Sequence, residues 1–392
     1  MTAPSRSRVC VTGMAWYTAL GSGLDEVWES LLADNSGLRE VDAPHALRNR
    51  RAAVVPQLPL DLHPAERQHL MTVDALARCL DDAALAMDDP RLQPVLGTSY
   101  GPHLDTADTT SLSQWAQEAA AQSGLVRSPL TVTTACSAGS DTLLLALELL
   151  RSGAAEICVC GGIDVLTVSK RLGHSFLGTM SPDDLRAFDV KHDGTLLGEG
   201  AGFMVLEPEP SARARQARIH GFLSGAGSSN DAMGSVAPDA SGRTVTLAVQ
   251  RALSSGEVEA QDIAVISAHG SGTPVSDAVE AKSYEQLFGS GKERPVVFAT
   301  KGAFGHTLGA TGSLGAITVV QALKSGLAPP VHGLEEAIPE LSLPLPAGRP
   351  AVVRGRFGLS VTLGFGGFNT CLLFEGPGAA THEGTRLQGG RQ

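Results

Sequence analysis

The chain has 392 residues, of which 43% are hydrophobic, 4% are aromatic and 18% are charged, and its formal net charge is −11. This apolar fraction excludes a disordered or fibrous chain, and the acidic balance, with no basic cluster among aromatic residues, predicts neither nucleic acid nor an anionic membrane as a partner. No apolar run reaches the ~18 residues that a membrane-spanning helix needs.

The sequence pattern predicts buried strands that alternate with amphipathic helices. Short apolar runs ending in Gly, Ser or Thr predict strands at 9–12, 94–97, 156–161, 202–206, 262–268, 296–300 and 371–374. Apolar residues at helical spacing predict helices at 24–33, 71–86, 140–152, 242–254, 276–288 and 313–325. This alternation indicates an α/β fold whose helices cover a parallel or mixed sheet.

The two halves of the chain resemble each other. The segment LRSG at 150–153 recurs as LKSG at 323–326, 173 positions later, and each segment ends a predicted helix. An offset near half the chain length predicts a duplicated unit, and chance similarity between glycine-rich loops is the alternative. The stretch 207–218, which is rich in Pro, Glu and Arg, is then predicted to cross the protein surface between the two halves. The Gly-rich tail after Gly376 is expected to be disordered.

The cysteines predict neither disulfides nor a metal site. Six cysteines show no C-x-x-C pair and no regular spacing; they lie at positions 10, 79, 136, 158, 160 and 371. Thr12 and Gly13 interrupt the first apolar run too early for a signal peptide, so a cytoplasmic protein is expected. Four cysteines lie within aliphatic runs, where a thiol behaves as a small hydrophobic group. Cys136 lies in a different setting.

Cys136 lies where a short strand is expected to turn sharply into an apolar helix. The segment TTACSAG at 133–139 follows the apolar residues from Leu130 and precedes the helical run SDTLLLAL. This order resembles a nucleophile elbow. Free backbone N–H groups at the mouth of a helix favour a thiolate, so we expect the pKa of Cys136 to be lowered. A buried structural thiol is the alternative for a lone cysteine.

Two histidines follow later strands. His269 lies in AHGSGTP after the strand predicted at 262–268, and His306 lies in KGAFGH after the strand predicted at 296–300. Because reactive groups gather at the carboxyl ends of strands in open α/β sheets, these imidazoles and Cys136 are predicted to share one site. A histidine in a glycine loop is otherwise a local hydrogen-bonding residue.

Together these motifs resemble the Cys-His-His set of the β-ketoacyl synthases. Further matches run in the family's order: GTSYG at 97–101, FDVKHDG at 188–194, GEGAG at 198–202 and GFGGFN at 364–369. The likeness covers nearly the whole chain. It implies the thiolase-like fold, a duplicated α-β-α-β-α five-layer sandwich, with an N-terminal half at 1–210, a C-terminal half at 211–376 and a tail at 377–392. The last motif is closer to the ketosynthases of bacterial type II polyketide systems than to housekeeping fatty-acid enzymes.

The resemblance also implies a reaction and residue roles. An acyl group passes from an acyl carrier protein to Cys136, and a malonyl thioester then loses CO₂ and condenses with it, so neither metal nor other cofactor is expected. The implied catalytic residues are Cys136, His269, His306, Lys301 and Glu280. The implied substrate-binding residues are Phe365, which acts as a mobile gate, Tyr100, Gly366 and Thr273.

Some features depart from the family, and other functions stay open. Only 34 residues separate Gly101 from Cys136, fewer than is usual, and the bulk of Tyr100 predicts a short, blocked or polar-ended acyl pocket. One alternative is acyl transfer to oxygen or nitrogen from the same cysteine. Another is a non-catalytic partner subunit that sets chain length, although such subunits generally lack the cysteine. The expected partner is a second copy or a related subunit, besides the carrier protein, for which arginines 48, 50, 51 and 67 are candidate contacts.

Overall fold

The structure is a computed structural model that describes residues 7–106, 111–234, 236–291 and 293–378. Within these residues the strands form one large mixed sheet with the order β10-β9-β13-β14-β8-β1-β7-β6-β4-β5. The strands of its first half are β1 (Val9–Tyr17), β4 (Leu92–Gly97), β5 (Leu130–Val132), β6 (Ile157–Asp164) and β7 (Gly200–Pro208). Those of its second half are β8 (Gly221–Asn230), β9 (Ile263–Ser267), β10 (Val296–Phe298), β13 (Phe357–Gly364) and β14 (Phe368–Glu375).

The helices complete the architecture together with two short antiparallel pairs of strands. The helices are α1 (Leu24–Leu32), α2 (Pro64–Asp82), α3 (Gln114–Ser123), α4 (Ala138–Arg151), α5 (Val168–Phe176), α6 (Glu209–Ala214), α7 (Arg243–Gly256), α8 (Pro274–Phe288), α9 (Lys301–Phe304) and α10 (Thr311–Ser325). Short 3₁₀ turns occur at η1 (His103–Asp105), η2 (Ala135–Ser137), η3 (Ala260–Asp262) and η4 (Leu308–Ala310). The small pairs are β2 (Leu38–Glu40) with β3 (Arg51–Ala53), and β11 (Leu327–Ala328) with β12 (Ala351–Val352).

The two halves of the sheet repeat the same topology. In the first half β1 pairs antiparallel with β7, β7 pairs antiparallel with β6, and β6, β4 and β5 run parallel. In the second half β8, β14, β13, β9 and β10 repeat this pattern in the same order. The halves meet through a short antiparallel pairing of β1 with β8, which joins residues 9–11 to 221–223. The duplicated unit expected from the sequence is therefore present in the strand order.

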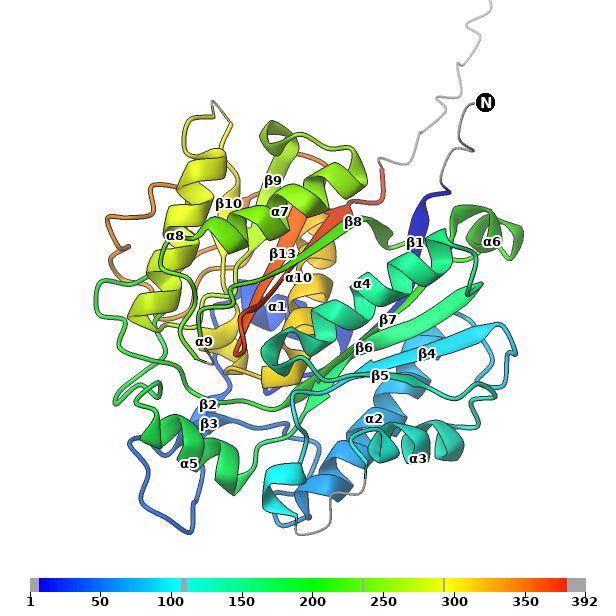
Figure 1. Ribbon diagram of the computed structural model, residues 1–392, viewed down its shortest axis with the longest axis horizontal. Helices are drawn as coiled ribbons and strands as arrows, with labels where there is room; N and C mark the ends of the chain where they lie inside the picture. The colour runs from blue at the N-terminus through cyan, green and yellow to red at the C-terminus, as the bar shows by residue number, and fades with distance from the viewer. Residues whose placement is uncertain (1–6, 107–110, 235, 292, 379–392) are drawn as a thin grey trace, which may run out of the picture.

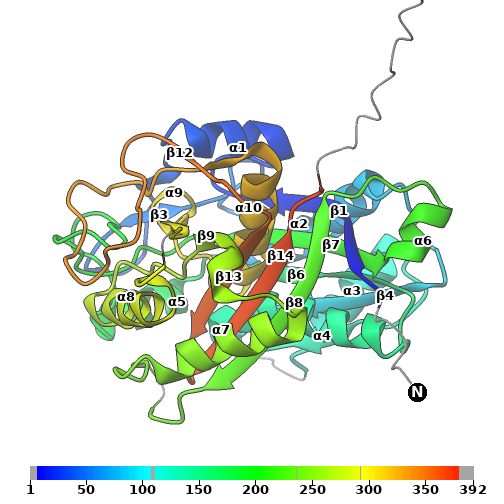
Figure 2. The same cartoon turned by 90° about the horizontal axis from the view of Figure 1, so that it is seen from above.

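The helices arrange these half-sheets into five layers. The helices α4 and α10 pack against each other and lie between the two half-sheets, while α2 and α3 cover the outer face of the first half and α7 and α8 lie outside the second (Figure 1). The view from above shows α10 near the centre of the molecule, beside β13 and β14 (Figure 2). This is the α-β-α-β-α order that the resemblance implied, with the two half-sheets joined at one edge.

The repeat holds at single residues. The turn η4 begins 173 residues after the turn η2, and the helix α10 begins 173 residues after the helix α4. Ala135 and Leu308, the first residues of the two turns, both have positive φ, at 50° and 49°. Gly139 and Gly312 are equivalent in the same way, and each faces the other central helix closely, where a side chain would collide with backbone. The predicted boundary at residue 210 falls inside α6.

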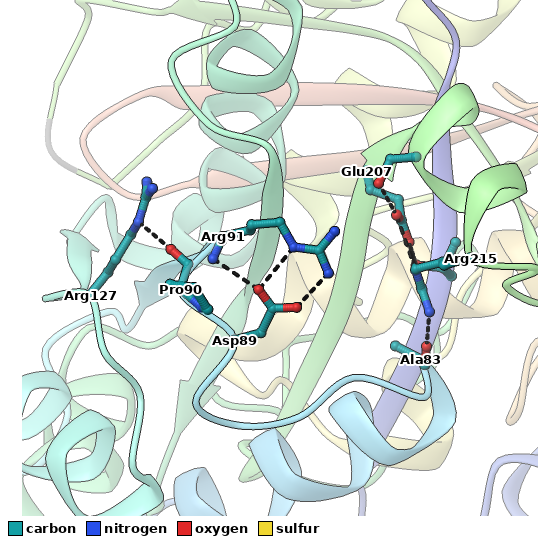
Figure 3. A network of polar contacts seen from close by, with 9 residues as sticks. Ala83, Asp89, Pro90, Arg91, Arg127, Glu207 and Arg215 are labelled. Carbon is teal, nitrogen blue, oxygen red and sulfur yellow. Dashed lines mark hydrogen bonds and ion pairs between the residues drawn. The ribbon is translucent and has the colours of Figure 1, made fainter.

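The chain between the halves is more buried than its composition predicted. Glu207, at the end of β7, is buried and accepts hydrogen bonds from the Thr12 and Ser211 hydroxyl groups, both at 2.7 Å. The Arg215 guanidinium donates to the same carboxylate and, at 2.6 Å, to the carbonyl oxygen of Ala83 at the end of α2, as Figure 3 shows. The expected surface crossing at 207–218 is thus wrong at its start, because charge pairing offsets the cost of burying this glutamate.

Several elements escaped the sequence pattern. The strands β8 and β13 and the helices α3 and α5 were not expected. The pattern missed β8 because this strand contains glycines in place of larger apolar residues. A Cβ at Gly227 would lie 2.5 Å from the Ala252 nitrogen of α7, and a Cβ at Gly225 would lie 2.8 Å from the Gly256 nitrogen. These small residues therefore let the helix approach the strand. Nearly all of the tail predicted to be disordered lies outside the described residues, and among the described helices none is long and apolar enough to cross a membrane.

Candidate active site

Cys136 lies in the turn that links β5 to α4. The turn carries the positive φ of Ala135 directly before the cysteine, a backbone strain that is common at functional turns. Cys136 is 4% exposed, and its Sγ lies 3.3 Å from Nε2 of His306. The turn η2 packs against η4 and against β13, so the first half of the chain places the thiol at the junction with the second half.

Both predicted histidines lie beside this thiol. His269 follows β9 at the start of the loop that leads into α8, and His306 follows the single-turn helix α9. Their ring centroids are 5.3 Å apart and the rings stand nearly perpendicular at 87°. The structure therefore brings together Cys136, His269 and His306 from the segments that follow β5, β9 and α9.

The hydrogen bonds of the two imidazoles define their tautomers. The backbone N–H of Leu308 donates to Nδ1 of His306 at 3.3 Å, so Nδ1 carries no proton in the neutral ring and Nε2–H points at the thiol. Lys301 Nζ lies 3.4 Å from Nδ1 of His269 and acts as the donor there. Burial first, and then the charge of Lys301, lowers the pKa of both histidines well below the usual value, so both rings are neutral. The site thus offers two neutral N–H donors.

Lys301 and Glu280 lie behind His269 and fix its loop. The Lys301 ammonium donates to the carbonyl oxygen of His269, and the Glu280 carboxylate accepts the backbone N–H groups of His269 and Gly270, both at 2.7 Å, as well as the Tyr284 hydroxyl at 2.6 Å. Burial lowers the pKa of Lys301 and raises that of Glu280. Neither residue lines the cavity, and both hold the loop that carries His269. The charge of Lys301 also reaches the Cys136 sulfur.

The pKa of Cys136 differs from the expectation. Burial raises the pKa of the thiol to about 11, while the charge of Lys301 and hydrogen bonds from the backbone N–H groups of Phe365 and Cys136 lower it less. The lowered pKa predicted from the helix mouth is therefore wrong, because loss of solvation outweighs those donors. The two N–H groups converge on the sulfur, where an oxyanion of an acylated cysteine would also form.

A cavity of about 370 Å³ opens from the thiol. Its lining includes Cys136, His269, His306, Phe365 and Thr273 among the predicted residues. Gly366 is absent from the lining, although Gly364 and Gly367 belong to it, and Gly366 has the positive φ of 83° that a hinge beside Phe365 uses readily.

Tyr100 does not line this cavity. Its ring packs edge-on against His103, with centroids 5.6 Å apart, in the segment between β4 and α3. Within one chain, Tyr100 is therefore not placed to contact an acyl group in this cavity. Whether this side chain limits acyl length stays a prediction.

Sequence reasoning missed His174. This residue lies in α5, lines the cavity and stacks on Phe365 with centroids 5.6 Å apart and planes 19° apart. The sequence offered only a histidine in a segment, 168–176, that the pattern did not predict to be a helix. The packing of α5 over the cavity, a long-range feature, gives this residue its place.

Comparison with known proteins finds family models that match most of the chain. Residues 6–212 match the family model described as "Beta-ketoacyl synthase, N-terminal domain", and residues 220–335 match "Beta-ketoacyl synthase, C-terminal domain". The chain is 28% identical to the 3-oxoacyl-[acyl-carrier-protein] synthase 2 of Mycobacterium tuberculosis, over 93% of this chain and 96% of that protein. It is 29% identical to the protein of the same name from Synechocystis, over 94% of this chain and 98% of that protein.

Solved structures show the same fold. The ishigamide ketosynthase/chain length factor superposes with a TM-score of 0.85 at 29% identity, covering 95% of this chain and all of that chain. A beta-ketoacyl synthase from Burkholderia phymatum gives 0.84 at 29% identity, covering 94% of this chain and 99% of that one. The fold is thus the thiolase-like ketosynthase fold that the motifs implied. From these matches, which span both halves, the chain belongs to the beta-ketoacyl synthase family, whose enzymes are acyltransferases.

Proposed function

We propose that this protein catalyses the decarboxylative condensation of a Cys136-bound acyl group with a malonyl thioester on an acyl carrier protein. The product is a 3-oxoacyl thioester, made in type II polyketide or specialised fatty-acid synthesis. The observation that carries the proposal is the 3.3 Å approach of the Cys136 sulfur to His306 Nε2, with His269 facing the same cavity. A nucleophile and two donors for a developing negative charge are what this reaction needs.

In the first step the acyl group moves onto the enzyme. The Sγ of Cys136 attacks the carbonyl carbon of the acyl thioester, the new S–C bond forms, and the bond to the carrier sulfur breaks. The thiol proton leaves, and the departing carrier thiolate ends as a thiol. The tetrahedral oxyanion forms near the backbone N–H groups of Cys136 and Phe365, which already hydrogen-bond toward the sulfur. The positive charge of Lys301 favours the thiolate in the same step.

In the second step a carbon–carbon bond forms. The malonyl carboxylate leaves as CO₂, and its electron pair becomes an enolate whose oxygen faces the Nε2–H groups of His269 and His306. The enolate carbon attacks the acyl carbonyl, the S–C bond to Cys136 breaks, and the released thiolate takes a proton from solvent. Neutral imidazoles suit this role, because a donor that keeps its proton stabilises the enolate without quenching it. Lys301 and Glu280 hold the His269 loop in this position.

We also propose an acyl carrier protein as the substrate carrier and a second copy or a related ketosynthase-like subunit as the partner. The net charge of −11 gives no general attraction to an acidic carrier, so docking depends on a local basic patch. Arg48 and Arg50 are partly exposed and remain candidates, whereas Arg67 is buried against Glu199 and is removed from that set. Chromatography with light scattering, with and without a co-expressed partner, tests the assembly.

The reaction is tested by intact-protein mass spectrometry with acyl and malonyl carrier protein. We expect an acyl adduct on the wild-type chain, CO₂ release and a carrier-bound product extended by two carbons. Cys136→Ala removes the adduct, and Cys158→Ala, which changes a buried cysteine outside the cavity, keeps it. An adduct without CO₂ release supports acyl transfer to oxygen or nitrogen instead. Absence of any wild-type adduct refutes the proposal in favour of a non-catalytic subunit.

A further inference from the structure

A third histidine faces the cavity. His174 is 8% exposed and its ring lies 6.4 Å from that of His306, measured between centroids. The stack against Phe365 holds the plane of the His174 ring, and the hydrogen bond between its Nδ1 and the Thr179 hydroxyl, at 2.9 Å, holds the rotation of that ring. The proposed reaction assigns no step to this imidazole.

The hydrogen bonds of His174 give it the opposite tautomer to the other two histidines. The Thr179 hydroxyl donates its single hydrogen to the carbonyl oxygen of His174 at 3.3 Å, so its oxygen accepts the Nδ1–H of the ring. Nε2 therefore carries a lone pair. Within the described residues Nε2 has no hydrogen-bond partner, and because it is not among the fully buried side-chain atoms that lack one, it keeps contact with solvent. The His174 side chain lines the cavity.

The His174 ring stays neutral, so this lone pair persists at physiological pH. Burial, and then the charge of Lys170, lowers the pKa of His174 to about 4. His269 and His306 present donors, as do the two N–H groups beside Cys136, and all four suit carbonyl oxygens. Nε2 of His174 is an acceptor in the same cavity, so it cannot form a hydrogen bond with any of those carbonyl oxygens.

We infer that His174 Nε2 accepts a hydrogen bond from an O–H or N–H group of the bound thioester, which makes His174 a specificity-determining residue. The inference rests on the proposed function, since it needs an acyl or malonyl thioester beside Cys136. The donor comes either from a hydroxyl group on the acyl chain near its thioester or from an amide of the carrier's prosthetic arm. A saturated acyl chain supplies no such donor.

The test uses two variants that separate the acceptor from the ring. His174→Phe keeps an aromatic ring to stack on Phe365 and removes the lone pair, while His174→Gln restores an acceptor oxygen. The readout is the second-order rate constant for acylation of Cys136, followed by intact-protein mass spectrometry. Three thioesters of equal acyl length are compared: a carrier-bound 3-hydroxyacyl group, a carrier-bound saturated acyl group, and the saturated acyl thioester of a simple alkanethiol without amides.

Loss of one neutral hydrogen bond to a buried group predicts a fall of about 10-fold or more in this rate constant for His174→Phe, with partial recovery in His174→Gln. A fall confined to the 3-hydroxyacyl thioester identifies the donor as the acyl hydroxyl. A fall for both carrier-bound thioesters, but not for the alkanethiol ester, identifies it as the arm amide. Equal rate constants in wild type and His174→Phe, or an equal fall for all three thioesters, overturns the inference.

The same samples keep this inference separate from the proposed function. Product formation by the wild-type chain with malonyl carrier protein is measured in parallel. If wild type forms no acyl adduct or no condensation product, the proposed function fails. If wild type condenses normally and the variant shows no change in substrate preference, only the role of His174 fails.

Discussion

Replacing Gly312 with alanine perturbs the contact between the two central helices. A Cβ at this position would lie 2.5 Å from the backbone nitrogen of Ser140, and closer still to its hydroxyl oxygen, whereas an ordinary contact needs at least 3.4 Å. The helices α4 and α10 must therefore separate by about 0.9 Å at this point, the difference between those two distances. Cys136 is attached to the start of α4, and His306 lies six residues before Gly312.

This separation predicts losses of both activity and stability. A displacement near 1 Å between reacting groups costs on the order of 100-fold in rate, so kcat/KM for condensation should fall by about that factor in Gly312→Ala. Overpacking of a core costs ~1–3 kcal/mol. At ~2.1 cal/mol/K per residue, the unfolding entropy of a chain this long is about 0.8 kcal/mol/K, so Tm should fall by ~1–4 °C.

Differential scanning fluorimetry and a condensation assay measure these two quantities. The control is Gly173→Ala in α5, where, among the described residues, no atom lies within 4 Å of the added methyl group apart from the chain neighbours and the nearby backbone of the helix itself. There alanine should raise helix stability by ~0.5–1 kcal/mol, since glycine costs that much in a helix interior. If Gly312→Ala keeps kcat/KM within about twofold and leaves Tm unchanged, close packing of α4 on α10 does not position the thiol.

Two further predictions concern the site itself. With a pKa of about 11, the fraction of Cys136 present as thiolate rises about tenfold per pH unit below that value. The rate of alkylation of Cys136 by iodoacetamide should therefore increase without a plateau from pH 7 to 9. A plateau below pH 8 would show a lowered pKa instead. Glu280→Gln turns one of the oxygens that accept the His269 and Gly270 N–H groups into a donor. We therefore expect kcat to fall ~10-fold or more, while acylation of Cys136, measured by mass spectrometry, changes little. Equal losses in both steps would contradict a role through His269.

The sequence by itself determined the family, the repeat and the three side chains that meet in the cavity. These rest on patterns that can be read along the chain. Two are local, the small-residue turn before Cys136 and the glycine loops after strands at His269 and His306, and the third is a 173-residue offset that the structure reproduces between η2 and η4. Turn and strand-end chemistry involves residues close in sequence, so it can be recognised from sequence alone. The order of motifs along the chain then implied the duplicated five-layer fold.

The tertiary structure decided everything that depends on burial and distant contacts. His174 has no distinctive neighbours in sequence and gains its place because α5 packs over the cavity. The thiol of Cys136 has a raised pKa because the surrounding elements exclude water, an effect that the local turn does not encode. Glu207 is buried despite a polar neighbourhood because Thr12 and Arg215 reach it from elsewhere in the fold. Solvation and long-range pairing arise only when the chain is folded, and they set the electrostatics of this site.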